Sequence, residues 1–277
     1  MALGIGKKPQ ATTAQIEWFL VWFTAMFFWW IAINTFHLID TSQNYAFGLV
    51  FGLIPLVGGV LGLRNAIRWG GEKSVMGRAT GLLSLGLVSW SIGGLIWAYY
   101  NFFCAVYVPY PSLADAAYVI SWPLWAAGAI QLSRATGARF SLRSLKGKLL
   151  LITIPVLVSI VSYYLLITVA RGGELDLSSG IVKVFFDLAY PIGDVVILSF
   201  ALLIYGLSFK YLGGRYRYAI LMLVTGFVLN YFADFAFSWT TTTETFYVAG
   251  WVDLLFMAAM TALSIGVVGL NPFVREE

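Results

Sequence analysis

Long apolar segments alternate with short polar ones along the chain. A helix needs about 20 residues to cross a hydrocarbon core about 30 Å thick, and eight apolar segments are close to this length or longer. The segments between them are too short to form a separate soluble domain. The eight predicted membrane helices are Ile16–Phe36, Ala46–Leu63, Ala79–Tyr99, Leu113–Leu132, Leu149–Ala170, Val184–Leu207, Tyr218–Trp239 and Phe246–Leu270.

Composition supports the same fold class. Of the 277 residues, 60% are hydrophobic and 11% are charged, and the mean hydropathy is +0.84. A soluble globular domain is far more balanced, so the sequence predicts an all-α polytopic membrane protein whose main partner is the lipid bilayer.

Basic residues predict the orientation. All 17 Lys and Arg residues except Arg171 and Lys183 lie in the tails, in alternate loops or at the adjoining helix ends, all on one side. The positive-inside rule therefore predicts a multi-pass protein of the cell membrane with both termini in the cytoplasm. Basic loops against anionic headgroups explain the pI of about 9.1, so no nucleic-acid partner is expected.

The second half of the chain resembles the first. The segment from Gly86 to Tyr99 aligns without a gap with Gly226 to Trp239, and Asp115 to Tyr118 aligns with Asp253 to Phe256. Because each copy has four spans, the copies have the same orientation, which makes the repeat parallel. The predicted organisation is a tail (1–15), a first four-helix copy (16–133), a basic cytoplasmic linker (134–148), a second copy (149–270) and a tail (271–277).

Charged residues in the sixth predicted helix are the strongest functional signal. Lys183, Asp187 and Asp194 recur at steps of four and seven residues, which places them on one helix face. An Asp near the bilayer centre costs about 2.5–3.5 kcal/mol on insertion scales, so such residues usually face the bundle interior. Lys183 and Asp187 can also neutralise each other as a simple i, i+4 pair.

The second copy carries more acids than the first. Asp194 and Asp234 stand where the first copy has Gly59 and Gly94. Asp115 follows Pro111-Ser112 at a predicted helix start, so it either caps that helix or turns inward. These acids all fall in the predicted outer half of the bundle. The predicted ligand-binding residues are Asp187, Asp194, Asp234, Asp253, Lys183, Tyr190, Asn230, Trp251 and Asp115.

Several site types are disfavoured by single residues. Cys104 is the only cysteine and His37 the only histidine, so an intramolecular disulfide, a cysteine-based metal site and a bis-histidine haem are excluded. No metal, cofactor or enzymatic activity is predicted, although carboxylates alone could serve an aspartyl-type dyad. Lys183 with Asp187 mimics a retinal Schiff-base lysine and its counter-ion, but Lys183 lies at a helix end, on the sixth of eight spans.

Two motifs carry a resemblance to a known class of proteins. The segments "PSLADAAY" from Pro111, with Trp122-Pro123 after it, and "DLAYPIGD" from Asp187 to Asp194 resemble membrane-spanning N-terminal modules of bacterial signalling proteins. Those modules precede GGDEF/EAL domains or histidine kinases. The resemblance covers the third to eighth predicted helices, is most specific in "PSLADAAY", and implies a sensory membrane domain. This chain ends at Glu277 with no output domain, so a signal would pass through a separate partner.

Three interpretations of the acidic residues remain open. The first is a non-enzymatic membrane sensor that binds a small molecule, a lipid or a cation from outside and signals through a cytoplasmic or membrane partner. The second is a small transporter or channel in which Asp194 and Asp234 relay protons or cations. The third is a structural polar network that joins the two copies. Apart from Glu17 at the very start of the first helix, the predicted inner halves contain no acid, which disfavours transport.

Overall fold

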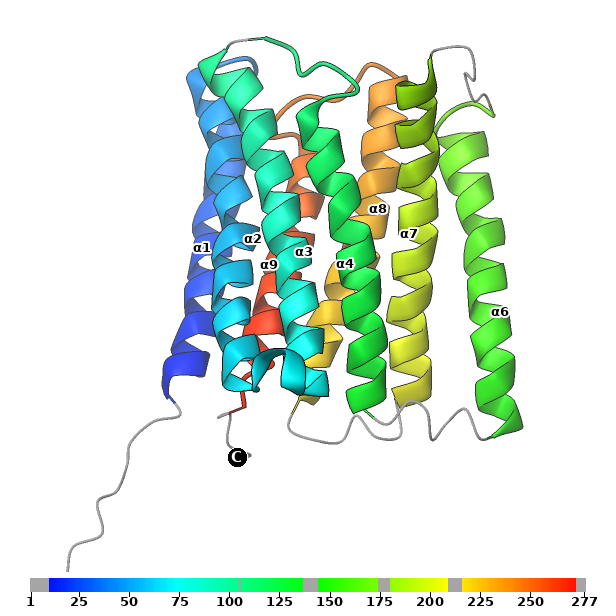
Figure 1. Ribbon diagram of the computed structural model, residues 1–277. Helices are drawn as coiled ribbons and strands as arrows, with labels where there is room; N and C mark the ends of the chain where they lie inside the picture. Colours follow the sequence, from blue (N-terminus) through cyan, green and yellow to red (C-terminus); the bar gives the residue numbers. More distant parts are fainter. Residues whose placement is uncertain (1–9, 105, 137–143, 174–179, 209–215, 273–277) are drawn as a thin grey trace, which may run out of the picture.

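The computed structural model describes residues 10–104, 106–136, 144–173, 180–208 and 216–272. Within them the chain forms a bundle of helices aligned along one axis (Figure 1). Eight are long and apolar enough to span a membrane, which confirms the predicted all-α fold with eight membrane helices. The helices are α1 (Gln10–Thr35), α2 (Ser42–Arg68), α3 (Val75–Ala98), α4 (Leu113–Ala135), α6 (Leu145–Ser162), α7 (Ile181–Ser208), α8 (Arg217–Thr242) and α9 (Trp251–Gly269). Short π-helical segments, η2 (Tyr99–Phe103) and η3 (Tyr163–Val169), extend α3 and α6, and a 3-10 turn, η1 (Gly71–Lys73), precedes α3.

Helix boundaries differ from the predicted ones where capping decides them. The prediction for α2 was too short at both ends, because Thr41 caps it in an extended conformation and the helix continues to Arg68. The last helix was predicted from Phe246, but α9 begins at Trp251. Ala249, with φ of 61°, breaks the chain direction there, and its N–H is bound by the side chain of Asp253 instead of a helical carbonyl. Apolar residues alone do not reveal these caps.

Polar side chains of the first copy hold the loop before α9. Trp30 and Asn34 on α1 donate to the carbonyls of Gly250 and Ala249, each at 3.0 Å. Asn44 on α2 donates to the carbonyl of Val248 at 3.1 Å. Buried carbonyls need such partners, so three hydrogen bonds fix the start of α9 against the other half of the chain.

Hydrogen bonds from the first copy also hold the C-terminal end of α9. Its last carbonyls have no partner within the helix. Asn65 donates to the carbonyl of Val268 at 3.0 Å, and the Trp69 indole donates to that of Leu270 at 2.8 Å. Together with close packing against α8 and α2, these bonds bury nearly all of α9 from Met257 onward.

Contacts between α3 and α4 recur between α8 and α9. Gly128 lies directly against Leu83, and Gly266 lies directly against Leu223. These are the residues that the predicted repeat makes equivalent, with the same offsets as its aligned segments. The recurring contacts support the two-copy interpretation, which otherwise stays a prediction. Of the predicted linker, residues 137–143 lie outside the described part of the chain.

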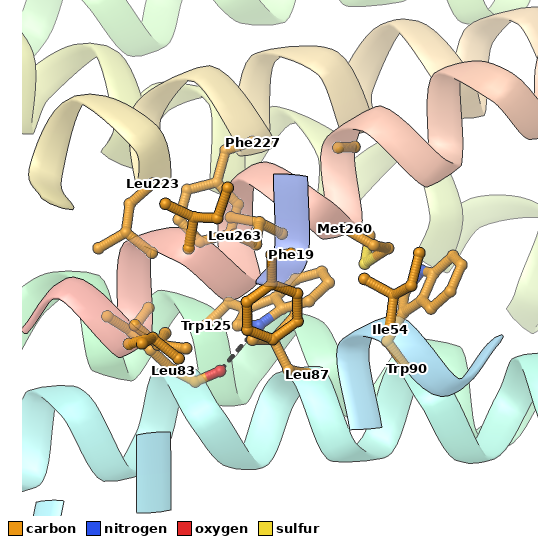
Figure 2. Packing of buried hydrophobic residues seen from close by; sticks show 14 of the residues in the cluster. Phe19, Ile54, Leu83, Leu87, Trp90, Trp125, Leu223, Phe227, Met260 and Leu263 are labelled. Atoms are coloured by element: carbon orange, nitrogen blue, oxygen red, sulfur yellow. Dashed lines mark hydrogen bonds between the residues drawn. The ribbon is translucent and has the colours of Figure 1, made fainter. Parts of the chain in front are cut away.

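Toward the predicted cytoplasmic ends of the helices, the interior of the bundle is packed with apolar side chains. Leu83 and Leu87 of α3, Trp125 of α4 and Leu263 of α9 meet there and are almost fully buried (Figure 2). The Trp125 indole donates to the carbonyl of Leu83 at 3.2 Å, so its one polar atom is satisfied. This packed layer forms the floor of the site.

Candidate functional site

A cavity of about 540 Å³ lies between the two predicted copies, in the half of the bundle that the sequence predicts to be the outer one. Helices α2, α3 and α4 line one side, and α7, α8 and α9 line the other. This volume is typical of small-molecule sites. Of the predicted ligand-binding residues, seven line the cavity, namely Asp115, Lys183, Asp187, Tyr190, Asp194, Asp234 and Asp253.

The other two predicted residues do not line it. Asn230 is 2% exposed and lies one helical turn inward from Asp234, to which its amide donates at 2.6 Å. It therefore supports the site without facing the cavity. Trp251 is 43% exposed and is not in the lining. It precedes Asp253 by two residues, a rotation of about 200° on a helix, so the two side chains point to opposite faces. The prediction that Trp251 lines the site was wrong.

Asp187 joins several segments at the cavity's outer side. The Tyr110 hydroxyl donates to its Oδ1 at 2.8 Å, Arg171 lies 3.4 Å from the same oxygen, and Lys183 lies 3.5 Å from Oδ2. Arg171 also donates to the Asp187 carbonyl at 3.1 Å. Burial and the bond to Asp187 raise the pKa of the Tyr110 phenol above its ordinary value of about 10. The simple Lys183–Asp187 pair is thus part of a larger cluster.

Asp115 acts both as a helix cap and as a cavity residue. Its Oδ2 accepts from the backbone N–H of Ser112 at 2.7 Å, which completes the capping box at the start of α4. Its Oδ1 accepts from the Tyr190 hydroxyl on α7 at 2.7 Å. The two alternatives left open for this residue are therefore both correct, and the carboxylate links α4 to α7.

Asp253 occupies the matching place in α9. Its Oδ2 accepts from the backbone N–H of Ala249 at 2.6 Å, just before the helix. Asp115 and Asp253 are both the third residue of their helices, as the predicted repeat requires. Each carboxylate is held by backbone at a helix N-terminus, where the helix dipole favours negative charge.

Asp194 and Asp234 form a carboxyl pair deeper in the cavity. Their carboxyl groups, on α7 and α8, lie close enough to interact electrostatically, and both line the cavity. Asp194 is 3% exposed, and Asn230 orients Asp234 from behind. Two helices therefore bring an acid each to the same part of the cavity.

Aromatic side chains form the rest of the wall. The Trp90 ring lies 5.3 Å from that of Tyr118 and 5.8 Å from that of Phe256, between centroids. Further out, Phe237 packs 5.9 Å from Trp97, and both line the cavity. The sequence analysis did not single out this wall. It also missed Tyr110 and Arg171. The one available signal was that Arg171 is one of two basic residues on the predicted outer side.

The carboxylates are spread around the cavity instead of converging on one point. No three His, Cys, Asp or Glu side chains in the described part of the chain are arranged to hold a metal ion. The Tyr118 ring lies within electrostatic range of Asp115, Asp234 and Asp253. The cavity therefore combines an acidic surface with an aromatic one.

No protein-family model, curated protein or solved structure matches the chain. The resemblance to bacterial sensory modules accordingly stays a prediction, and the site must be interpreted from its own chemistry.

Proposed function

We propose that the protein is a non-enzymatic membrane receptor, which binds a small molecule from outside in the cavity between its two copies. The observation that carries the proposal is a cavity of about 540 Å³ with five Asp side chains in its wall, inside a bundle that is otherwise apolar. Buried carboxylates are costly unless something compensates them. A solvent-filled or ligand-filled site is where such residues are retained.

The packed layer below the cavity favours binding over conduction. Leu83, Leu87 and Trp125 fill the space that a transport path toward the inner end would have to cross (Figure 2). A receptor needs a closed floor, whereas a channel needs polar groups to continue through it. The proposed outside position of the cavity rests on the positive-inside orientation, with both termini in the cytoplasm of the cell.

Binding would act on the contacts between copies. The cavity is bordered by α4 and α7, which pack against each other and share the bond from Tyr190 to Asp115. A ligand that binds one arrangement of these helices better shifts the equilibrium toward it. We propose that a cytoplasmic or membrane partner senses this change, in keeping with the resemblance to sensory modules.

The alternative is a small transporter that uses Asp194 and Asp234 as a relay. The specific observation in its favour is that the two carboxyl groups lie within electrostatic range of each other in the cavity, because a relay passes a proton or a cation between neighbouring groups. Proton flux into proteoliposomes that Asp194→Asn abolishes would favour this alternative.

Native mass spectrometry of protein purified from its own membranes, with lipid extraction, tests the receptor proposal. We expect a bound small molecule or specific lipid that is lost in Asp194→Asn and Asp234→Asn. Both substitutions keep the size of the side chain and its capacity to accept a hydrogen bond, and remove only the acid. Glu244→Gln, at an exposed turn outside the cavity lining, is the matched control. Protein that is empty in every preparation would contradict the receptor proposal.

A further inference from the structure

On the acidic side of the cavity, the carboxyl oxygens that can accept hydrogen bonds outnumber the donors that the described residues supply. No described residue is seen to donate a hydrogen bond to Asp194, which lies within electrostatic range of another carboxyl group, that of Asp234. Asp253 accepts from Ala249 through Oδ2, and no described residue donates to its Oδ1. All three side chains line the cavity, so a ligand that brings positive charge or hydrogen-bond donors would be stabilised there.

The basic side chains in the lining contact only one of the five acids. Arg171 and Lys183 both lie within 4 Å of Asp187, toward the outer end of the cavity. Among residues that the structure describes, no ion pair reaches Asp194, Asp234 or Asp253. The deeper part of the cavity therefore holds three acids without a basic partner among the described residues, and a cationic ligand would favour their ionised form.

The aromatic wall lies next to these acids. Trp90, Tyr118 and Phe256 form a continuous aromatic surface. The Tyr118 ring is within electrostatic range of Asp234 and Asp253, and its hydroxyl has no hydrogen-bond partner among the described residues. Aromatic faces attract cations, with Trp the strongest, and the attraction is greatest in desolvated sites.

An inorganic cation does not fit this arrangement. Calcium takes six to eight oxygen ligands at about 2.3–2.6 Å, and the described carboxylates offer no such cluster. The cavity of about 540 Å³ is also far larger than a metal ion and is mostly lined by carbon. Size, charge and aromatic lining together require a ligand that is both cationic and organic.

We propose that the cavity binds an organic cation, a quaternary or protonated amine with an apolar body, whose positive group lies between Trp90, Tyr118 and the carboxyl groups of Asp234 and Asp253. This rests on the proposed receptor function and names its ligand class. The apolar body then lies along the aromatic residues toward the outer end.

Benzyltrimethylammonium and its neutral isostere neopentylbenzene test the charge requirement. Isothermal titration calorimetry of the full chain, with both probes in the same detergent micelles, compares their affinities. We expect the cation to bind at least about ten-fold more tightly, since cation–π and carboxylate contacts both depend on its charge. Equal affinities would overturn the proposal.

Single substitutions test whether benzyltrimethylammonium binds on the acidic side of the cavity. Asp253→Asn can still accept from Ala249, so the start of α9 should remain intact while the charge is lost. We expect it to weaken benzyltrimethylammonium binding about ten-fold and to leave neopentylbenzene unaffected. Trp90→Phe, which keeps an aromatic face, should bind better than Trp90→Leu. In Glu244→Gln, the matched control for charge, affinity should be unchanged, and a loss there equal to that in Asp253→Asn would contradict the proposed site.

The outcomes separate the ligand class from the receptor function. If neither probe binds but native mass spectrometry finds a neutral or anionic molecule in the cavity, the receptor function stands and the organic cation is wrong. If neither probe binds and the protein is empty, both proposals fail. Calcium chloride alone should give no binding heat, and heat that disappears in Asp234→Asn would overturn the organic class.

Discussion

Two glycines on α3 should respond in opposite ways to the same substitution. A Cβ at Gly86 would lie 2.3 Å from Cδ1 and 2.4 Å from Nε1 of Trp125, far closer than van der Waals contact. A Cβ at Gly94 would have its nearest neighbours at 3.7 Å, the Trp90 ring and the Tyr118 hydroxyl. Gly86→Ala therefore forces a collision, whereas Gly94→Ala only reduces the cavity.

The cost at Gly86 follows from its neighbour. Trp125 is 1% exposed and has no empty space to move into. Overpacking of this kind costs about 1–3 kcal/mol, and loss of the Trp125–Leu83 hydrogen bond adds about 1–3 kcal/mol. The better helix propensity of alanine offsets up to about 1 kcal/mol of this destabilisation. The expected net destabilisation of Gly86→Ala is about 1–5 kcal/mol, against a change between zero and a gain of about 1 kcal/mol for Gly94→Ala.

Thermal unfolding of the two variants in one detergent measures this difference. At about 2–4 °C per kcal/mol for a chain of 150–250 residues, we expect the Tm of Gly86→Ala to lie clearly below that of Gly94→Ala. Gly94→Ala should instead weaken ligand binding, because its methyl group enters the cavity. If Gly86→Ala is as stable as Gly94→Ala, the tight α3–α4 contact is not as described and the reasoning fails.

Three further predictions concern topology, the outer cluster and the end of α9. A membrane-impermeant maleimide should label Cys104 on intact cells, because this residue is exposed at the predicted outer end. A cysteine placed at Gly71 in a Cys104→Ser background should be labelled only after permeabilisation. The reverse result would invert the topology. The raised pKa of Tyr110 stabilises the fold below about pH 10, and this contribution is lost as the pH rises further. Tyr110→Phe should therefore flatten the fall of Tm above pH 10. An unchanged pH profile would contradict the bond to Asp187. Asn65→Leu should destabilise the protein by about 1–3 kcal/mol in equilibrium unfolding, because a buried carbonyl of α9 loses its donor; a neutral effect would show that this bond does not hold α9.

The sequence predicted the helices because apolar length is a direct physical requirement of the bilayer. It missed the start of α9, since that boundary depends on the bond from Ala249 to Asp253, which no apolar pattern reveals. Phe246 is apolar and was therefore predicted to be helical, but it lies in the loop and lines the cavity.

The acids of the site were predictable because carboxylates are rare in apolar helices, so each one is informative by itself. The aromatic wall was not, since 17% of the chain is aromatic and most such residues suit membrane interfaces equally well. Trp251 lies outside the lining because a rotation of about 200° separates it from Asp253 on the helix. Tyr110 could only be found from the fold, because it reaches Asp187 from a loop 77 residues away.

The two halves of the chain contribute different chemistry to one cavity. Where α8 has Asn230 and Asp234, a hydrogen-bonded pair, the aligned positions of α3 have Trp90 and Gly94. Gly94 leaves room in front of the Tyr118 hydroxyl, and Trp90 supplies an aromatic face opposite the acids. A ligand that needs both surfaces must therefore contact both halves at once. Its binding energy then depends on how the halves pack, and the proposed sensor function rests on this dependence.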